Sequence, residues 1–134
     1  MTYRTNPKTG EKVSILGYGC MRWPTKKVEG SEEEIIDQDA VNELVDYALA
    51  HGVNYFDTAP PYCQGKSEKA TGEALRRHPR DSYYIATKMS NHRLAGQGLS
   101  PQEMYDQSVA MYRKSFRELS TDYFDYYLMH IVGG

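Results

Sequence analysis

Apolar residues along this chain follow two spacings that alternate. Four short runs are rich in strand-forming residues. They lie at residues 15–20, 53–57, 83–88 and 123–130. Three longer stretches carry apolar residues every three or four positions, as amphipathic helices do. They lie at residues 39–50, 67–78 and 101–119. Strands that alternate with helices over short connections predict an α/β fold, with a parallel sheet and helical crossovers.

Capping residues support the helix boundaries. Asp37 or Asp39 is expected to cap the first helix. Ser100 and Glu103 are spaced as a capping box for the third helix. The spacing also predicts which side chains face the core. In the first helix these are Val41, Leu44, Val45, Ala48 and Leu49, and in the third Tyr105, Ser108, Val109, Tyr112, Phe116 and Leu119.

Two segments lie outside the alternation. Residues 3–14 predict a small hairpin, because the turn-forming sequence N-P-K-T-G occupies Asn6–Gly10 between two short extended stretches. Residues 21–34 are polar and irregular and predict a loop. The acidic run Glu32–Glu34 is expected on the solvated surface of that loop.

Composition narrows the class of protein. A chain of 134 residues is enough for one domain, and 40% apolar with 25% charged residues is typical of a soluble globular protein. A net charge of −2 gives no electrostatic reason to expect nucleic acid or an anionic membrane as a partner. No apolar run approaches the ~20 residues of a membrane span. Two cysteines without C-x-x-C spacing predict a reduced, cytoplasmic protein.

Two parallel fold families fit the alternation: an open doubly wound sheet, or part of a (β/α)8 barrel. Gly17 and Gly19 lie within the first strand pattern, but Arg22 stands where the dinucleotide-binding fingerprint has its third glycine. The G-x-G-x-x-G motif is therefore absent. An open-sheet phosphate binder is accordingly the least favoured function.

Ionisable residues end three successive strands. They are Asp57, Lys88 and His130. The carboxyl ends of parallel strands form one rim, and neighbouring strands lie ~4.8 Å apart. An acid, a base and an imidazole are thus predicted to meet there. Tyr62, in the loop after the second strand, joins them if that loop folds back. We call these four residues the rim quartet.

The rim quartet has a chemical rationale. A phenol is a weak acid near neutrality, and a nearby ammonium group stabilises its phenolate form. Asp57 would orient Lys88, and His130 would steer a substrate oxygen. A phenol activated in this way can protonate a developing alkoxide, as carbonyl reduction requires. The electrons must come from elsewhere, and a nicotinamide hydride is the usual source.

Each residue of the quartet also has a purely structural interpretation. Lys88 and Asp57 form an ordinary ion pair in that reading, His130 bonds the backbone at a strand end, and Tyr62 is a loop aromatic. No metal site is predicted, because His51, His78 and His92 have no ligand spacing with the two cysteines.

Four motifs together resemble the aldo-keto reductases in order and spacing. They are S-I-L-G-Y-G-C-M-R-W-P, V-N-Y-F-D-T-A-P-P-Y, I-A-T-K and T-D-Y-F-D-Y-Y-L-M-H. The resemblance is nearest to bacterial members that often carry a C-terminal iron–sulfur extension. It implies a (β/α)8 barrel preceded by a hairpin, and NADPH-dependent reduction of aldehydes and ketones.

The resemblance assigns roles by position. Tyr62 would be the general acid, Lys88 would stabilise its phenolate, Asp57 would pair with Lys88, and His130 would position the carbonyl. Met21 and Asp57 would contact NADPH, and Trp23 and His130 the substrate. One motif departs from the family: the usual G-E/S-E after the tyrosine is Gly65-Lys66-Ser67-Glu68 here.

Residues 1–134 are expected to form a single domain, the first half of such a barrel, ending after its fourth strand. Most of the NADPH site would then belong to a missing half, and an iron–sulfur cluster only to a missing extension. Half a barrel has unpaired edge strands, through which copies could self-associate. Two further readings stay open: a reductase that is inactive without its other half, and a non-catalytic binding or assembly module.

Overall fold

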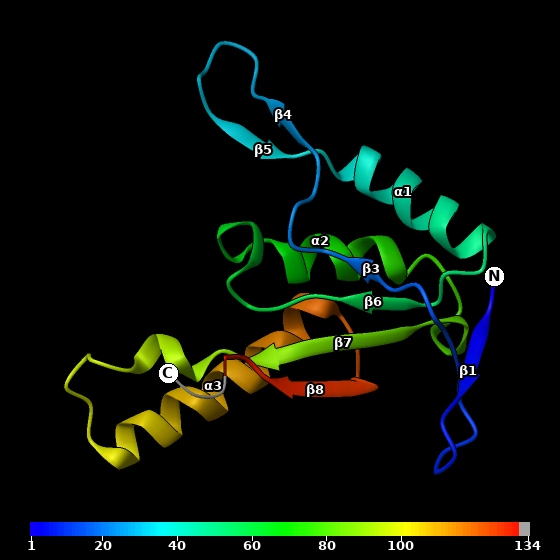
Figure 1. The fold of residues 1–134 in the computed structure, drawn as a ribbon. Coiled ribbons are helices and arrows are strands. Elements are labelled where there is room, and N and C mark those ends of the chain that lie inside the picture. The colour runs from blue at the N-terminus through cyan, green and yellow to red at the C-terminus, as the bar shows by residue number, and fades with distance from the viewer. Residues whose placement is uncertain (132–134) are drawn as a thin grey trace.

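A four-stranded parallel sheet forms the centre of the fold, and its strands lie side by side in chain order (Figure 1). The computed structural model describes residues 1–131. The strands are β3 (Tyr18–Gly19), β6 (Tyr55–Asp57), β7 (Tyr84–Met89) and β8 (Tyr126–Met129). The connecting helices are α1 (Gln38–Ala50), α2 (Ser67–Leu75) and α3 (Pro101–Leu119). The predicted α/β alternation is therefore confirmed.

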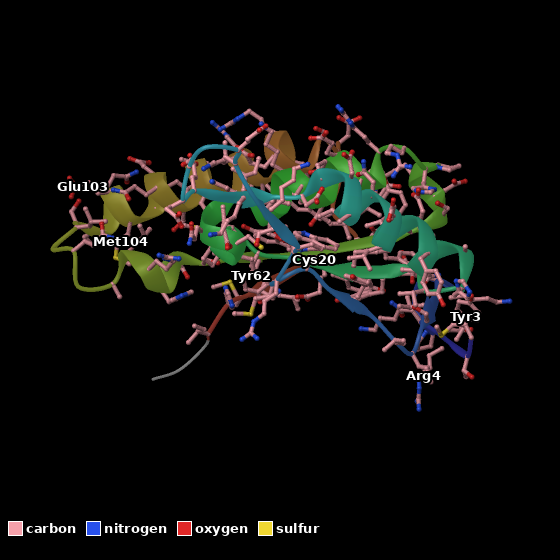
Figure 2. The ribbon with its side chains drawn as sticks, turned by 90° about the horizontal axis from the view of Figure 1, so that it is seen from above. Tyr3, Arg4, Cys20, Tyr62, Glu103 and Met104 are labelled. Atoms are coloured by element: carbon pink, nitrogen blue, oxygen red, sulfur yellow. The ribbon has the colours of Figure 1, made fainter. Side chains whose placement is uncertain are left out.

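The helices lie on one side of the sheet, as the view from above shows (Figure 2). Successive side chains of a strand point to opposite faces. Phe56 and Thr87 point toward the helices, where Phe56 is fully buried and Thr87 bonds Glu68 of α2. Asp57 and Lys88 follow them directly and so lie on the other face. The face that carries the site is thus the one that the helices do not cover.

The hydrophobic core lies between the sheet and α1 and α2. Its members are mostly small or branched side chains, with three large aromatic ones. They are Cys20, Trp23, Val41, Val45, Ala48, Val53, Phe56, Ala70, Ala74, Leu75, Tyr83, Ile85 and Leu119. Tyr18 of β3 packs against this core, with its ring stacked on Trp23 and Phe56.

Two antiparallel hairpins lie outside the parallel sheet. β1 (Tyr3–Thr5) pairs with β2 (Lys12–Ser14), which confirms the predicted N-terminal hairpin. β4 (Thr25–Lys27) pairs with β5 (Glu34–Ile36). The prediction of a loop over residues 21–34 is therefore wrong for this part of the chain. Figure 1 shows the second hairpin projecting from the body of the molecule.

The second hairpin is held together by charged and polar pairs, and for this reason the hydrophobic pattern did not predict it. Its strands are short and β4 is fully exposed, so they lack the alternation of apolar and polar residues that marks a half-buried strand. Lys27 instead contacts Glu32 at 3.2 Å, and the Thr25 hydroxyl donates to Glu34 at 3.0 Å. Gly30 makes the turn with a φ of 76°. The acidic run faces basic and polar partners across the hairpin.

The first predicted strand is shorter than expected. The strand pattern covers residues 15–20, but Ile15 and Leu16 lie outside the observed strand and are 60% and 59% exposed. Only Tyr18–Gly19 pairs with β6, and the Cys20 amide then donates to the Asp57 carbonyl at 2.8 Å.

The predicted helix faces are correct only in part. Asp37 is the cap of α1, and the capping box of α3 is present. In α1, Leu44 is 37% exposed although it was predicted to face the core. In α3, Tyr105 and Tyr112 are 64% and 39% exposed, and the buried residues are Ser115 and Leu119. Ser115 is completely buried, whereas the aromatic side chains of Tyr105 and Tyr112 lie toward solvent. Similarly, α2 ends at Leu75 instead of residue 78.

Gly72 sets the distance between α2 and α3. A Cβ atom at this position would lie 2.5 Å from the Leu119 carbonyl oxygen, closer than non-bonded atoms approach. We expect Gly72→Ala to lower the free energy of unfolding by about 1–3 kcal/mol, because backbone atoms must move apart. Urea unfolding of the 134-residue chain measures this loss. Gly19→Ala is the matched control, since a Cβ there meets no atom within 4 Å and should cost less.

Candidate functional site

Asp57 and Lys88 form an ion pair at the carboxyl ends of β6 and β7. Lys88 Nζ lies 2.5 Å from Asp57 Oδ1 and also donates to the Thr58 carbonyl oxygen at 2.8 Å. The side chains are 12% and 31% exposed, Lys88 being the more buried. Two acceptors therefore fix the ammonium group of Lys88 in place.

Tyr62 lies directly above this ammonium group. The η1 turn (Tyr62–Gly65) follows the Pro60–Pro61 corner and carries Cys63 and Gln64 at φ values of 51° and 57°. Such left-handed conformations are unfavourable for residues with a side chain and occur often at functional sites. Lys88 Nζ lies 4.8 Å from the centroid of the Tyr62 ring. The turn thus brings the phenol over the cation.

His130 closes the same rim from the end of β8. Its ring meets that of Tyr62 edge-on, with 5.7 Å between the centroids. The amide of His130 donates to the Met89 carbonyl at 2.9 Å, which continues the pairing of β7 with β8. Burial is the main reason that the pKa of His130 lies below its ordinary value, and the charge of Lys88 adds to this effect. The structure therefore brings all four residues of the rim quartet together, and their catalytic roles stay a prediction.

The two residues assigned to the first loop have different environments. Met21 is 55% exposed, and its carbonyl oxygen accepts a hydrogen bond from the Cys63 thiol at 3.3 Å. Trp23 is only 5% exposed, and its indole N–H donates to the Thr71 hydroxyl at 3.0 Å. Both line a cavity of about 270 Å³ beneath the β4–β5 hairpin. Contact of Met21 with a cofactor and of Trp23 with a substrate stays a prediction.

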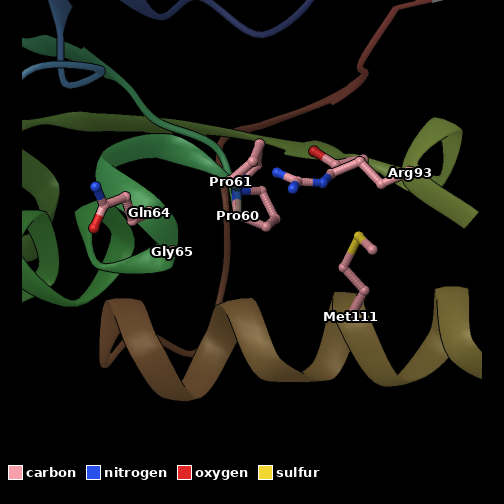
Figure 3. A pocket seen from close by; sticks show the side chains of 7 residues that line it. Pro60, Pro61, Gln64, Gly65, Arg93 and Met111 are labelled. Atoms are coloured by element: carbon pink, nitrogen blue, oxygen red, sulfur yellow. The ribbon is translucent and has the colours of Figure 1, made fainter.

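A second cavity, of about 530 Å³, lies beside the rim quartet (Figure 3). Its lining comes from the η1 turn, the segment after β7 and helix α3. The lining residues are Pro60, Pro61, Gln64, Gly65, Ser90, Arg93 and Met111. Figure 3 shows Arg93 and Met111 reaching into this space from opposite sides. Ser90 connects it to the quartet, because its hydroxyl also contacts His130.

Four residues in or behind the site were not predicted as functional residues from the sequence. The Ser90 hydroxyl lies 2.9 Å from His130 Nδ1, and His92 Nδ1 lies 3.1 Å from the His130 carbonyl oxygen. The Thr87 hydroxyl donates to Glu68 Oε1 at 2.6 Å. The sequence offered two signals for these residues. Thr87, Ser90 and His92 lie close to Lys88 in the chain, and Glu68 belongs to the motif that follows the family's tyrosine. The turn after β7 (η3, Asn91–Leu94) determines which side chains reach the rim. This turn has no periodic pattern, so the sequence does not predict its path.

Glu68 is a buried carboxylic acid, 3% exposed, and burial raises its pKa above the ordinary value of 4.5. The folded protein therefore keeps this proton at pH values where the unfolded chain has lost it. Its contribution to stability is greatest below pH 4.5 and is lost as the pH rises through the folded-state pKa. Within that window the loss is at most about 1.4 kcal/mol per pH unit.

We expect Glu68→Gln to remove this loss. Its free energy of unfolding, relative to that of the unmodified chain, should rise as the pH increases from below 4.5 to neutrality. Urea unfolding at a series of pH values measures the difference. Glu29→Gln is the control, because Glu29 is exposed in the turn of the second hairpin. A pH-independent difference for Glu68→Gln would contradict the expectation.

Two further findings concern metals and membranes. Among residues 1–131, no three His, Cys, Asp or Glu side chains are grouped so that they could hold a metal ion. None of the helices within that range is long and apolar enough to cross a membrane. Cys20 is fully buried, and burial raises the pKa of its thiol to about 12. This thiol is therefore not a candidate nucleophile.

Comparison with known proteins gives consistent relatives. Residues 15–134 match the profile described as "Aldo/keto reductase family". The probable aldo-keto reductase 1 of Glycine max is 31% identical over 129 residues, covering 92% of this chain and 34% of that protein. The chain thus spans about a third of the length of this curated relative.

Two solved structures show the same fold. Aldo-keto reductase AKR11C1 from Bacillus halodurans is 31% identical, with a TM-score of 0.69 over 97% of this chain and 40% of that one. An aldo/keto reductase from Klebsiella pneumoniae is 25% identical, with a TM-score of 0.63 over 90% of this chain and 36% of that one. These neighbours are (β/α)8 barrels, and the parallel sheet with its helices corresponds to part of such a barrel. By profile, by identity and by fold, this chain belongs to the aldo/keto reductase family of oxidoreductases.

Proposed function

We propose that this chain contributes the catalytic rim of an NADPH-dependent reductase of aldehydes and ketones. The observation that carries the proposal is the position of Lys88 Nζ, 4.8 Å from the centroid of the Tyr62 ring. A cation there stabilises the phenolate that Tyr62 becomes when it gives up its proton. Asp57 keeps the cation in place, and His130 faces Tyr62 from the neighbouring strand.

The proposed reaction divides between two donors. Bound NADPH supplies a hydride to the carbonyl carbon. Tyr62 gives its hydroxyl proton to the carbonyl oxygen, so the C=O double bond becomes C–H and O–H and the product is an alcohol. Lys88 holds the resulting phenolate until solvent returns the proton. His130 orients the carbonyl oxygen toward Tyr62 by a hydrogen bond from its ring.

The donor set of this site fits a nicotinamide cofactor. A phenol, an ammonium, a carboxylate and an imidazole can move a proton, but none of them supplies an electron pair. The Klebsiella pneumoniae relative was solved with NADP and acetate, and the Bacillus halodurans relative in its holo form. We propose that Met21 and Asp57 contact the cofactor from this chain, since both reach the rim partly exposed. Trp23 and His130 are proposed for the substrate side.

The proposal includes a dependence on the rest of the barrel. The helix-free face of the sheet holds the quartet, and relatives of this chain are about three times as long. We propose that residues 1–134 do not turn over carbonyl substrates by themselves, because most of the cofactor contacts lie on later strands.

A chimera tests this proposal. Residues 1–134 replace the matching segment of the Bacillus halodurans reductase, with which they share 31% identity. We expect the chimera to oxidise NADPH when a simple aldehyde is added, and the 134-residue chain to show no such activity. The unmodified Bacillus halodurans enzyme is the positive control. A folded chimera that binds NADPH but does not reduce aldehydes would contradict the proposal.

One observation favours a second candidate, a non-catalytic association module. Leu128 and Met129 of β8 are 41% and 59% exposed at an edge of the sheet, and Ile15 and Leu16 are exposed next to the other edge strand, β3. Light scattering of the 134-residue chain distinguishes the two candidates when combined with NADPH titration. Stable self-association without NADPH binding supports the module, and a monomer argues against it.

A further inference from the structure

Ser90 occupies the position that controls the ring of His130. It follows β7 directly, and its hydroxyl lies 2.9 Å from His130 Nδ1. The side chain of Ser90 is completely buried. The pairing of Met89 with Met129, continued by the bond from the His130 amide to the Met89 carbonyl, places Ser90 and His130 beside each other. The contact is therefore held by the sheet itself.

We propose that Ser90 is a positioning residue whose hydroxyl donates to Nδ1 of His130 and holds this imidazole as the tautomer protonated on Nε2. The proposal deepens the proposed function, on which its catalytic meaning rests. The tautomer itself is a property of residues 1–134 and is testable without any reductase activity.

The direction of the hydrogen bond follows from the needs of the serine. A hydroxyl has one hydrogen to donate, and a buried donor left without an acceptor costs about 1–3 kcal/mol. Within residues 1–131, His130 is the single hydrogen-bond partner of the Ser90 hydroxyl. If Nδ1 carried the proton, the serine would accept and its own hydrogen would be unsatisfied. Nδ1 therefore accepts, and the proton of the neutral ring is on Nε2.

The surroundings of the ring favour its neutral form. Lys88 faces it from β7 and His92 from the turn after β7, and both disfavour a positive charge. Burial acts in the same direction, and Asp57 alone opposes it. His92 reaches only the backbone carbonyl of His130 through Nδ1, with its ring edge-on at 5.2 Å between centroids. Ser90 is thus the side chain that can decide between the two neutral tautomers.

The consequence is a hydrogen-bond donor on the His130 ring that is left available to a ligand. Among the hydrogen bonds of residues 1–131, none uses Nε2 of His130. A proton on Nε2 leaves an N–H group beside the Tyr62 ring, where a carbonyl oxygen could accept from both His130 and Tyr62. The opposite tautomer would present a lone pair there and repel that oxygen. Ser90 therefore acts on substrate orientation through His130.

Nitrogen NMR of histidine tests the proposal directly. The 134-residue chain is labelled with nitrogen-15 at its four histidines, and long-range proton–nitrogen spectra assign each tautomer. Single His→Gln variants at positions 51, 78 and 92 identify the His130 signals. We expect His130 Nδ1 to be unprotonated and Nε2 protonated near neutral pH. A wild-type spectrum with the proton on Nδ1 would overturn the proposal, whatever any variant does.

Variants then test whether Ser90 is the cause. Ser90→Ala should lower the ratio of the two tautomers by about fivefold, the equivalent of one neutral hydrogen bond. Ser90→Cys, whose thiol is a weaker donor, should give an intermediate ratio. Ser115→Ala is the matched control, because Ser115 is equally buried but bonds the Met111 carbonyl in α3. An unchanged ratio in a folded Ser90→Ala chain would also overturn the proposal.

The same variant separates this inference from the proposed function. In the chimera, Ser90→Ala should lower kcat/KM for aldehydes while NADPH affinity stays unchanged. A chimera without activity whose His130 carries the predicted tautomer contradicts the reductase proposal only. An active chimera with the opposite tautomer contradicts the role of Ser90 only.

Discussion

Replacing Tyr62 with phenylalanine in the chimera should lower kcat/KM for aldehyde reduction by roughly 100- to 10,000-fold. The change removes the proton donor and leaves the ring over Lys88 Nζ, 4.8 Å from its centroid. The carbonyl oxygen would then develop negative charge with no acid beside it. Steady-state NADPH oxidation with a simple aldehyde measures the loss.

The controls for Tyr62→Phe separate chemistry from folding. Within residues 1–131 the Tyr62 hydroxyl makes no hydrogen bond. The Tyr62→Phe variant should therefore unfold at the same urea concentration as the unmodified chain. Tyr105→Phe makes the same chemical change in a side chain that is 64% exposed on α3, and should leave the rate unchanged. A Tyr62→Phe chimera with the full rate would show that another group supplies the proton.

The sequence was sufficient to predict that three ionisable residues meet at one rim, because strand ends are simple to locate. Each of Asp57, Lys88 and His130 follows a short apolar run, and parallel strands place such residues on one rim. The register of β6, β7 and β8 then brings them within contact. The position of Tyr62 was predicted only on the condition that its loop folds back, because it belongs to a turn whose left-handed residues have no periodic signal.

The parts that were missed lack an apolar pattern. The β4–β5 hairpin is held by pairs such as Lys27–Glu32 and by a glycine turn, and hydrophobic spacing does not report such contacts. Ser90 and His92 lie in a turn after β7, where the path of the backbone decides which side chains reach His130. Aromatic spacing on α3 was misleading, since the buried residues of this helix are Ser115 and Leu119, whereas Tyr105 is 64% exposed. Hydrophobic spacing locates helices and strands, whereas contacts between loops depend on the three-dimensional path of the backbone.

A second ion pair lies at the end of the sheet opposite the rim quartet, and it stabilises the fold. Arg80 donates to Asp125 Oδ2 at 2.7 Å, and the amide of Ile85 donates to the same oxygen at 2.8 Å. Arg80 also donates to the carbonyl oxygens of Tyr83 and Tyr123. These bonds join the starts of β7 and β8. In barrels of this type the amino ends of the strands serve stability and the carboxyl ends serve catalysis.

Asp125→Ala should therefore lower the free energy of unfolding by roughly 3–5 kcal/mol, a large share of the 5–15 kcal/mol of an ordinary domain. The side chain of Asp125 is 9% exposed, so its removal leaves the Arg80 charge without its carboxylate partner and the Ile85 amide without its acceptor. Urea unfolding of the 134-residue chain measures the loss. Asp46→Ala is the matched control, because its pair with Arg77 is about 40% exposed and should contribute less than about 1 kcal/mol. Equal losses in the two variants would mean that the Arg80–Asp125 pair does not join the strands as we infer.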